Sequence, residues 1–258
     1  MDSNVLIPIF LTCALFVLWL ISLWLKDASI VDIFWGPGFA AVAAIGLWRS
    51  PDVTVREQVF GLLAIIWGVR LGLYLAWRNI GRGEDRRYQA IRARYGARFP
   101  LLSLPLVFLF QGGLIWIISS PLQTIGGQAG EWRLADTIGG LIWLIGFGFE
   151  VVGDWQLARF KSDPANRVAI LDRGLWGWTR HPNYFGDALV WWGLTIPVIA
   201  AGAPWTIISP LIMTWLLRRF SGVPLLERGL RESRPGYEEY VARTSPFFPR
   251  PPRRREQR

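Results

Sequence analysis

The chain of 258 residues is 52% hydrophobic, 14% aromatic and only 18% charged, with a net charge of +9, one Cys and one His. This composition excludes a disordered chain, a disulfide framework, a thiolate metal cluster and an ordinary soluble enzyme, and it speaks against a histidine-ligated metal. Because the basic residues lie between long apolar runs, the sequence indicates an integral membrane protein and no nucleic-acid binder.

Seven apolar segments predict membrane-spanning helices, each of which needs about 20 mostly apolar residues. In chain order these segments are Asn4–Leu25, Ile30–Trp48, Gln58–Trp77, Leu101–Ser119, Thr137–Ala158, Gly186–Ala201 and Pro204–Phe220. The first is too long and too rich in Trp for a cleaved signal peptide. We therefore predict an all-α, polytopic domain over residues 1–249, followed by a basic, disordered tail over residues 250–258.

The basic residues predict the orientation of the chain. Of the 28 basic residues, 23 fall in three segments, which are Arg78–Arg98, Arg159–Arg180 and the stretch after Trp215. Seven spans place all three on one face, so the positive-inside rule puts the C-terminus in the cytoplasm and the N-terminus outside. Nearly all of these residues are Arg, whose planar guanidinium matches phosphate oxygens two at a time. In the simpler alternative the arginines only fix topology and attract anionic membrane lipids.

Several ionisable side chains fall inside the predicted spans, where a charge is costly and indicates function. They are Asp32, Arg70, Glu150, Asp154 and Asp187. Three pairs are spaced by four residues and so share a helix face, namely Arg70 with Tyr74, Glu150 with Asp154, and Asn183 with Asp187. We expect them to line a polar cavity that opens to the cytoplasm. The alternative is that they pair with one another and only fix helix packing.

The segment between the fifth and sixth spans has the features of an anion-binding turn. Pro182 ends any incoming helix and can begin the next one, whose N-terminus attracts anions such as a pyrophosphate. Gly174 and Gly177 permit tight turns and close approach of the backbone. His181 is the only histidine, and its default role is a hydrogen bond or a phosphate contact rather than catalysis.

The same segment carries a family resemblance. Arg180–Asp187 reads Arg-His-Pro-Asn-Tyr-Phe-Gly-Asp, which resembles the signature shared by membrane steroid 5α-reductases, sterol C14 reductases and isoprenylcysteine methyltransferases. Asp32-x-x-Trp35-Gly36, the stretch from Arg78 to Tyr88 and the stretch from Arg234 to Pro249 resemble the bacterial relatives of the 5α-reductases. The resemblance extends from the second span to the tail.

The resemblance implies an activity and a catalytic pair. Enzymes of this kind use NADPH to reduce a carbon–carbon double bond conjugated to a carbonyl, here in a lipophilic enone of steroid or isoprenoid type. Asp32 and Trp67 take the positions of the Glu and Tyr that hold the ketone oxygen in the steroid enzymes. An indole donates an N–H but no phenolic proton, so Trp67 is a departure from the family pattern.

The resemblance also implies a cofactor site and a location. The matching cofactor-binding candidates are Arg70, Tyr74, Glu150, Asp154, Arg173, Arg180, His181, Asn183, Tyr184, Asp187, Arg218, Tyr237 and Tyr240. The excess of Arg favours NADPH, with its additional phosphate, over NADH. The expected partners are membrane lipids and a lipophilic substrate, and the expected location is the bacterial inner membrane.

Two other functions fit the same residues. The Arg-His-Pro segment also occurs in S-adenosylmethionine-dependent methyltransferases that act on a lipid or an isoprenylcysteine. The departure at Trp67 also fits a membrane scaffold that keeps the fold and has lost turnover. Comparing stabilisation by NADPH with stabilisation by S-adenosylhomocysteine separates the two enzymatic functions.

Overall fold

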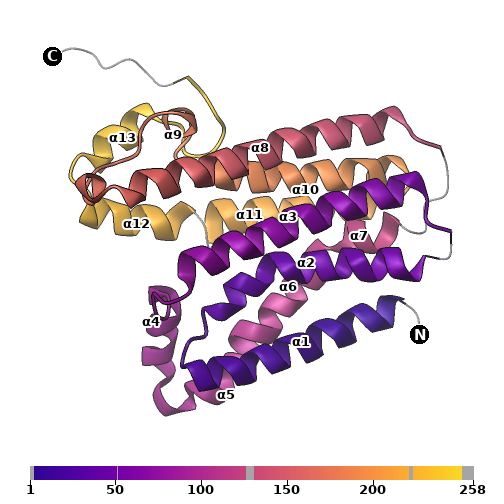
Figure 1. Ribbon diagram of the computed structural model, residues 1–258, viewed down its shortest axis with the longest axis horizontal. Helices are drawn as coiled ribbons and strands as arrows, with labels where there is room; N and C mark the ends of the chain where they lie inside the picture. The colour runs from indigo at the N-terminus through magenta and orange to yellow at the C-terminus, as the bar shows by residue number, and fades with distance from the viewer. Residues whose placement is uncertain (1–2, 51, 126–130, 221–222, 252–258) are drawn as a thin grey trace. The chain divides into compact units, whose positions relative to one another are not determined.

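The computed structural model describes residues 3–50, 52–125, 131–220 and 223–251, and all regular secondary structure in these ranges is helical (Figure 1). The chain forms two compact units. The first comprises residues 1–132 with 201–206, and the second comprises residues 133–200 with 207–258. Most of the tail predicted over residues 250–258 lies outside the described residues.

Three long helices and a run of shorter ones build the first unit. They are α1 (Ser3–Leu25), α2 (Ile30–Arg49), α3 (Val55–Asn79), α4 (Arg86–Tyr95), η1 (Gly96–Arg98), α5 (Phe99–Ser103), η2 (Leu104–Leu109), α6 (Phe110–Ile118) and α7 (Ser120–Thr124). The start of α3 is fixed by a capping box, in which the side chain of Thr54 accepts from the backbone N–H of Glu57 and the Glu57 carboxylate accepts from the backbone N–H of Thr54.

Two long antiparallel helices are the centre of the second unit (Figure 1). Its elements are α8 (Leu134–Ser162), η4 (Pro164–Asn166), α9 (Leu175–Trp178), α10 (Pro182–Ala200), α11 (Ile208–Trp215), η6 (Leu216–Phe220), α12 (Val223–Ser233) and α13 (Tyr237–Arg243), with η5 (Pro204–Ile207) leading into α11. As the sequence predicts, α10 begins at Pro182, where the missing N–H costs no helical hydrogen bond.

Five helices in the described ranges are long and apolar enough to cross a membrane. They are Val5–Leu25, Ile30–Arg49, Val55–Asn79, the continuous run Arg86–Ile118, and Leu134–Ser162. Each contains most of one of the first five predicted spans, so an all-α fold with several membrane-spanning helices is confirmed. The sixth and seventh predicted segments are helical as well, as α10 and as the run from η5 to η6, but they are not among these five.

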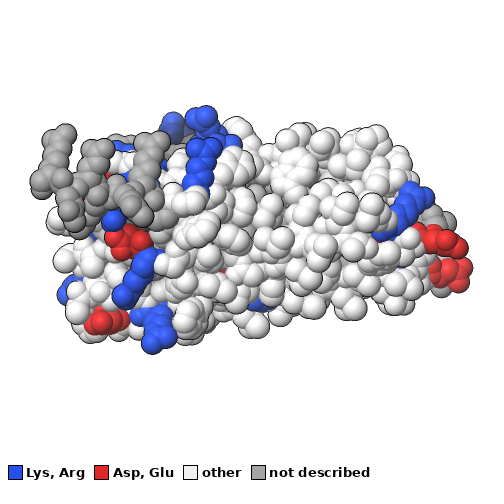
Figure 2. Space-filling view, turned by 90° about the horizontal axis from the view of Figure 1, so that it is seen from above, with Lys and Arg blue, Asp and Glu red and all other residues white. Residues whose placement is uncertain are grey.

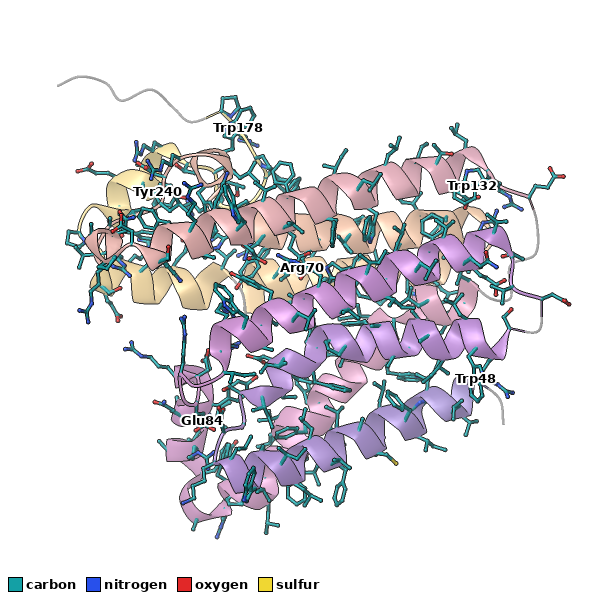
Figure 3. The ribbon with its side chains drawn as sticks, in the orientation of Figure 1. Trp48, Arg70, Glu84, Trp132, Trp178 and Tyr240 are labelled. Atoms are coloured by element: carbon teal, nitrogen blue, oxygen red, sulfur yellow. The ribbon has the colours of Figure 1, made fainter. Side chains whose placement is uncertain are left out.

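The exposed surface follows the same pattern. On the face shown in Figure 2 most of the visible charged side chains lie toward the two ends, and the residues between them are mostly uncharged. Along α8 the exposed apolar residues include Leu141, Leu144 and Ile145. Within the first unit, Trp48 and Trp132 lie at the opposite end from Glu84 (Figure 3), as expected of aromatic residues near a membrane boundary.

Helices α8 and α10 pack backbone to backbone through glycines. A methyl group on Gly186 would come within 2.5 Å of the carbonyl oxygen of Gly146 and within 2.6 Å of the amide nitrogen of Glu150. About two turns further along α10, a methyl group on Gly193 would lie 2.6 Å from the amide nitrogen of Trp143. Small residues at such crossings let helix backbones approach closely, which is how helices associate in lipid.

The first unit repeats this arrangement between α2 and α3. A methyl group on Gly36 would lie 2.3 Å from the carbonyl oxygen of Gly68, and one on Gly72 would lie 2.5 Å from the ring of Pro37. The Gly-Pro-Gly stretch lies within the continuous helix α2, and its small residues form the surface against which α3 packs.

We predict that Gly186→Ala lowers the stability of the protein and that Gly148→Ala does not. The new methyl of the first variant meets backbone atoms, which do not yield as a flexible side chain does, and overpacking costs about 1–3 kcal/mol. Nothing lies within 4 Å of a methyl group at Gly148 on the same helix pair. Thermal unfolding in detergent measures both, and equal midpoints for the two variants would contradict this packing.

Candidate functional site

A buried polar group lies where α8 and α10 meet. The carboxylates of Glu150 and Asp154 come from α8, and Asn183 and Asp187 come from the first turns of α10. The side chain of Asn183 donates a 3.1 Å hydrogen bond to Asp154 Oδ1. Glu150, Asp154 and Asp187 are all buried. The spacing of four residues on each helix therefore brings both predicted pairs to one interface.

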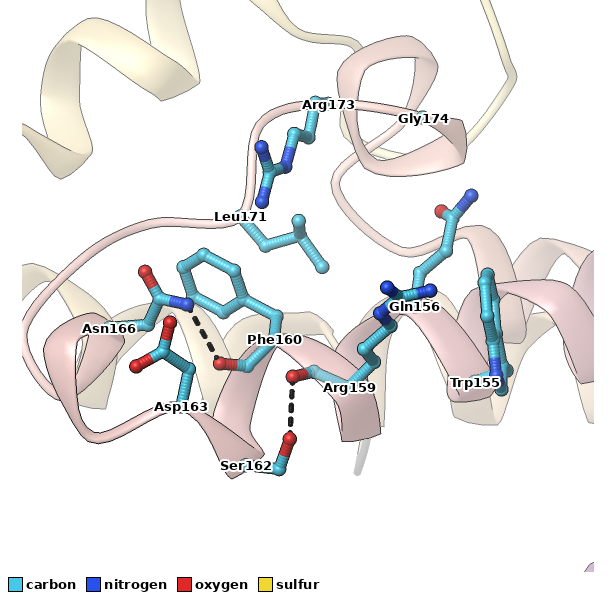
Figure 4. Close-up of a pocket in the computed structure, with 10 residues that line it drawn as sticks. All are labelled: Trp155, Gln156, Arg159, Phe160, Ser162, Asp163, Asn166, Leu171, Arg173 and Gly174. Carbon is cyan, nitrogen blue, oxygen red and sulfur yellow. Dashed lines mark hydrogen bonds between the residues drawn. The ribbon is translucent and has the colours of Figure 1, made fainter.

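A cavity of about 640 Å³ begins on α8 directly after Asp154 (Figure 4). It is lined by Trp155, Gln156, Arg159, Phe160, Ser162, Asp163, Asn166, Leu171, Arg173 and Gly174. Arg159 comes from the helix and Arg173 from the loop that follows it, so two guanidinium groups line one hollow. The acid in this wall, Asp163, already accepts a 2.9 Å hydrogen bond from the backbone N–H of Ala165.

Gly174 shapes the loop side of this cavity. Its φ of 62° is left-handed, and a methyl group there would lie 2.5 Å from the side chain of Gln156. Gln156 uses the space to accept a 3.1 Å hydrogen bond from the backbone N–H of Leu175, at the start of α9. The glycine predicted to permit close approach is therefore the residue that docks the loop on α8.

The predicted Arg-His pair meets an acid from the C-terminal part of the chain. Arg180 Nε donates a 2.7 Å hydrogen bond to Glu227 Oε1, and His181 Nε2 lies 3.1 Å from the same oxygen. Arg180 also donates to the carbonyls of Thr244, at 2.7 Å, and Val241, at 3.2 Å. All three charged or titratable side chains are at most 10% exposed, so the guanidinium of Arg180 is held inside the protein by its own chain.

A C-terminal strap over residues 244–250 continues this contact. The backbone N–H of Arg180 donates to the carbonyl of Ser245, and the hydroxyl of Thr179 donates to that of Phe247, both at 2.9 Å. Arg218 lies 5.3 Å from the ring centres of Phe247 and Phe248. The strap therefore lies alongside the Arg-His-Pro segment and covers it.

The predicted tyrosines belong to the same assembly. Tyr240 donates a 2.6 Å hydrogen bond to the carbonyl of Trp176, and its ring centre lies 5.8 Å from that of Tyr237. Tyr184 stacks on His181 with the ring planes 6° apart. These three phenol rings pack around the loop between α8 and α10.

In the first unit, Asp32 lies in a polar network of its own. Its two carboxylate oxygens accept hydrogen bonds of 2.6 Å each, one from Arg87 and one from the hydroxyl of Tyr88. Tyr88 in turn accepts a 3.0 Å hydrogen bond from the side chain of Gln111 on α6. Asp32 thus ties the start of α2 to α4, where sequence analysis expected a carbonyl-binding acid.

The other predicted residues of this unit lie on α3. Trp67 is fully buried, and its ring centre lies 5.8 Å from that of Phe39 on α2. Tyr74 lies between two guanidinium groups, those of Arg70 at 5.2 Å and Arg78 at 5.7 Å from its ring centre. The predicted pairing of Arg70 with Tyr74 on one helix face is therefore present.

The sequence did not predict Glu227, Tyr88 or Arg159 as site residues. Glu227 directly follows Leu225 and Leu226, so an acid at the end of a short apolar run was the available signal. A buried Arg needs a counter-charge, and that requirement points to some acid but does not say which. No group of three or more His, Cys, Asp or Glu side chains in the described residues is arranged to hold a metal ion.

These features define a helical membrane protein with a polar site at one end of a helix pair. The chain belongs to the family described as protein of unknown function DUF1295, whose model matches residues 18–244. This family lies in the steroid 5α-reductase-like superfamily, so the resemblance is confirmed at that level. The matched range contains Glu227 and the whole Arg-His-Pro segment.

A fungal protein is similar along most of its length. The chain is 27% identical over 268 residues to "Uncharacterized protein C594.04c" of Schizosaccharomyces pombe, an alignment that covers 91% of this chain and 76% of that protein. No solved structure gives a significant match.

The cluster of Arg180, His181 and Glu227 shifts two pKa values. Burial is the largest influence on Glu227 and would raise its pKa, but the hydrogen bonds with His181 and Arg180 and their charges together lower it to about 2. Burial also dominates at His181 and lowers its pKa below the usual 6.5, against the opposing effect of Glu227. The folded protein therefore favours a carboxylate beside a neutral imidazole.

We predict that stability falls as the pH is lowered from 6.5, because of His181. The imidazole binds a proton near pH 6.5 in the unfolded chain and only at lower pH in the folded protein. The free energy of unfolding therefore falls by at most about 1.4 kcal/mol for each pH unit below 6.5. Stability from Glu227, complete above pH 4.5, is lost between pH 4.5 and about 2. Since His181 is the only histidine, thermal unfolding of His181→Gln between pH 8 and 5.5 is the control, and an unchanged slope would contradict this assignment.

Proposed function

We propose that this protein is an NADPH-dependent membrane reductase that adds hydride to the conjugated carbon–carbon double bond of a lipophilic enone. One observation carries the proposal: α8 supplies Asp154, which pairs with Asn183 of α10, and directly after it Trp155, Gln156 and Arg159, which line an arginine-containing cavity of about 640 Å³. The cavity lies within the range of about 300–1,000 Å³ that small-molecule and cofactor sites occupy. Membership of a reductase-like superfamily supports the same class of reaction.

The residues present suit a dinucleotide. Arg159 and Arg173 can each offer a guanidinium fork to phosphate oxygens, and the guanidinium of Arg159 lies 5.5 Å from the ring centre of Trp155, which also lines the cavity. The acid and amide groups of Asp154 and Asn183 suit the hydroxyl and amide groups of a nucleoside. NADPH, when bound, supplies the hydride; this chain binds the cofactor, orients it and excludes water.

On the substrate side, we propose that Asp32 organises the groups that stabilise negative charge on the carbonyl oxygen as the double bond is reduced. Its carboxylate accepts the single O–H of Tyr88 and one N–H of Arg87, whose guanidinium has further N–H donors for the carbonyl oxygen. The indole N–H of Trp67 is a further candidate donor from α3. The proton that completes the reduction comes ultimately from water.

The proposed membrane arrangement has seven spans, an external N-terminus and a cytoplasmic C-terminus. The helical state of α10 and of the run from η5 to η6 supports the count, and the three arginine-rich segments support the orientation. We assign the protein to the bacterial branch of the family and to the bacterial inner membrane.

We predict that NADPH protects the detergent-solubilised protein from thermal unfolding more than NADH does, and that S-adenosylhomocysteine does not protect it. A ligand at one hundred times its Kd stabilises by about 2.7 kcal/mol. Protection by S-adenosylhomocysteine alone would favour the methyltransferase, and protection by none of the three would favour the scaffold.

Substitution tests the cavity separately. We expect Arg173→Ala to weaken NADPH binding by roughly ten- to a hundredfold, the value of one or two charge-assisted hydrogen bonds. The matched control is Arg167→Ala, which removes an exposed arginine of the same loop that does not line the cavity. Equal affinities for the two variants would contradict the proposed phosphate site.

We further predict that Asp32→Asn lowers turnover of an enone by at least about a hundredfold and leaves NADPH affinity unchanged. The matched control is Asp85→Asn, because Asp85 also binds Arg87, at 3.0 Å, but lies at the surface. A collapse of cofactor affinity in Asp32→Asn would assign Asp32 to the cofactor site instead.

A further inference from the structure

The buried contact between Glu227 and His181 fixes more than the position of a loop. Glu227 Oε1 receives the Nε–H of Arg180 at 2.7 Å and lies 3.1 Å from His181 Nε2. The His181 side chain is 3% exposed and its ring stacks on Tyr184. The imidazole therefore has one orientation and one close acidic partner.

The chemistry of this partner decides where the imidazole carries its hydrogen. An ionised carboxylate only accepts hydrogen bonds, so the nitrogen facing it, Nε2, must be the donor. Burial and the charge of Arg180 disfavour a second proton on the ring, and they outweigh Glu227. A neutral imidazole with its hydrogen on Nε2 has its lone pair on Nδ1, which is then an acceptor.

We propose that Glu227 is a positioning residue that holds His181 as the Nε2–H tautomer, so that Nδ1 accepts a hydrogen bond from a ligand hydroxyl such as that of a ribose. The identity of the ligand rests on the proposed function, whereas the tautomer does not. The charged and titratable groups around the pair are Arg180 from the loop, Arg231 from α12, Tyr184 from α10 and Tyr237 from α13. Burial raises the pKa of Tyr237 to about 12, so Tyr237 is neutral at physiological pH.

This role differs from the one expected of an isolated histidine beside arginines. An imidazolium would bind a phosphate, whereas a neutral ring that presents a lone pair repels one. The arginines of the cavity and the histidine beside the strap would then recognise different parts of one ligand, the phosphates and a sugar hydroxyl respectively.

The tautomer can be measured directly, because the chain has a single histidine. In the full-length protein labelled with ¹⁵N-histidine, we expect at pH 7.5 one protonated Nε2 and one unprotonated Nδ1. Glu227→Gln should give a mixture of tautomers, while Glu239→Gln, the same change at an exposed site of α13, should keep the wild-type spectrum. An imidazolium, or hydrogen on Nδ1, in the wild-type protein would overturn the proposal.

The ligand assignment has its own measurement, the affinity for NADP⁺ between pH 8 and 5.5. We expect the ratio of wild-type affinity to that of His181→Phe to be roughly three to ten at pH 8, the value of one hydrogen bond, and to fall toward one as Nδ1 is protonated. Dividing the wild-type affinity by that of the variant removes the effect of the titration of the ligand phosphate, which is common to both. A ratio that rises at low pH would make His181 a phosphate ligand and overturn the assignment.

The two measurements can contradict the proposed function and the role of Glu227 independently. If NADP⁺ does not bind at all, the proposed function and the sugar contact fall together, while the ring-nitrogen spectrum still decides the role of Glu227. If NADP⁺ binds and the spectrum shows hydrogen on Nδ1, the proposed function stands and the role of Glu227 is wrong.

Discussion

The close backbone packing of helix pairs is the constraint on which the rest of this structure depends. In lipid, apolar side chains gain little by leaving one apolar surface for another, so helices associate by packing closely and by satisfying polar groups. Gly146, Gly186 and Gly193 let α8 and α10 touch along their length, and Gly36 and Gly68 do the same for α2 and α3. Because Glu150 lies on this packed face of α8, close packing at the glycines also buries the polar site.

Each charge buried in this way requires a counter-charge or hydrogen-bond partners, and residues distant in the sequence supply them. Arg180 would be an uncompensated cation without Glu227, and breaking such a buried pair commonly costs about 3–5 kcal/mol. The acid comes from α12 and the carbonyls that share the guanidinium come from the region of α13. The C-terminal part of the chain is therefore held on the Arg-His-Pro segment by an ion pair and hydrogen bonds as well as by apolar contacts.

The contrast between helices and contacts shows what the sequence allows one to predict. Apolar runs predicted most of the long helices to within a few residues, because length and hydropathy are local properties, but the run Arg86–Ile118 begins well before the predicted span Leu101–Ser119. Spacing of four also predicted that Glu150 and Asp154, and likewise Arg70 and Tyr74, share a helix face. It did not predict that Asp32 would bind Arg87 and Tyr88, or that His181 would meet Glu227, because those pairings join residues 46 to 56 positions apart.

The arginines divide accordingly into two kinds, and the division sharpens the argument for a ligand. A surplus of arginine first suggested a phosphate site, yet Arg180 and Arg92 are engaged by Glu227 and Glu84. The ion pairs of those two arginines already explain their presence as structural contacts, so they are weaker evidence for a phosphate site. Arg159 and Arg173 differ because they line a cavity, and the acid beside them, Asp163, is already used as a helix cap. The charged side chains that line this cavity are two arginines and one aspartate, and this local excess of positive charge, rather than the net charge of the chain, is the physical basis for expecting a nucleotide.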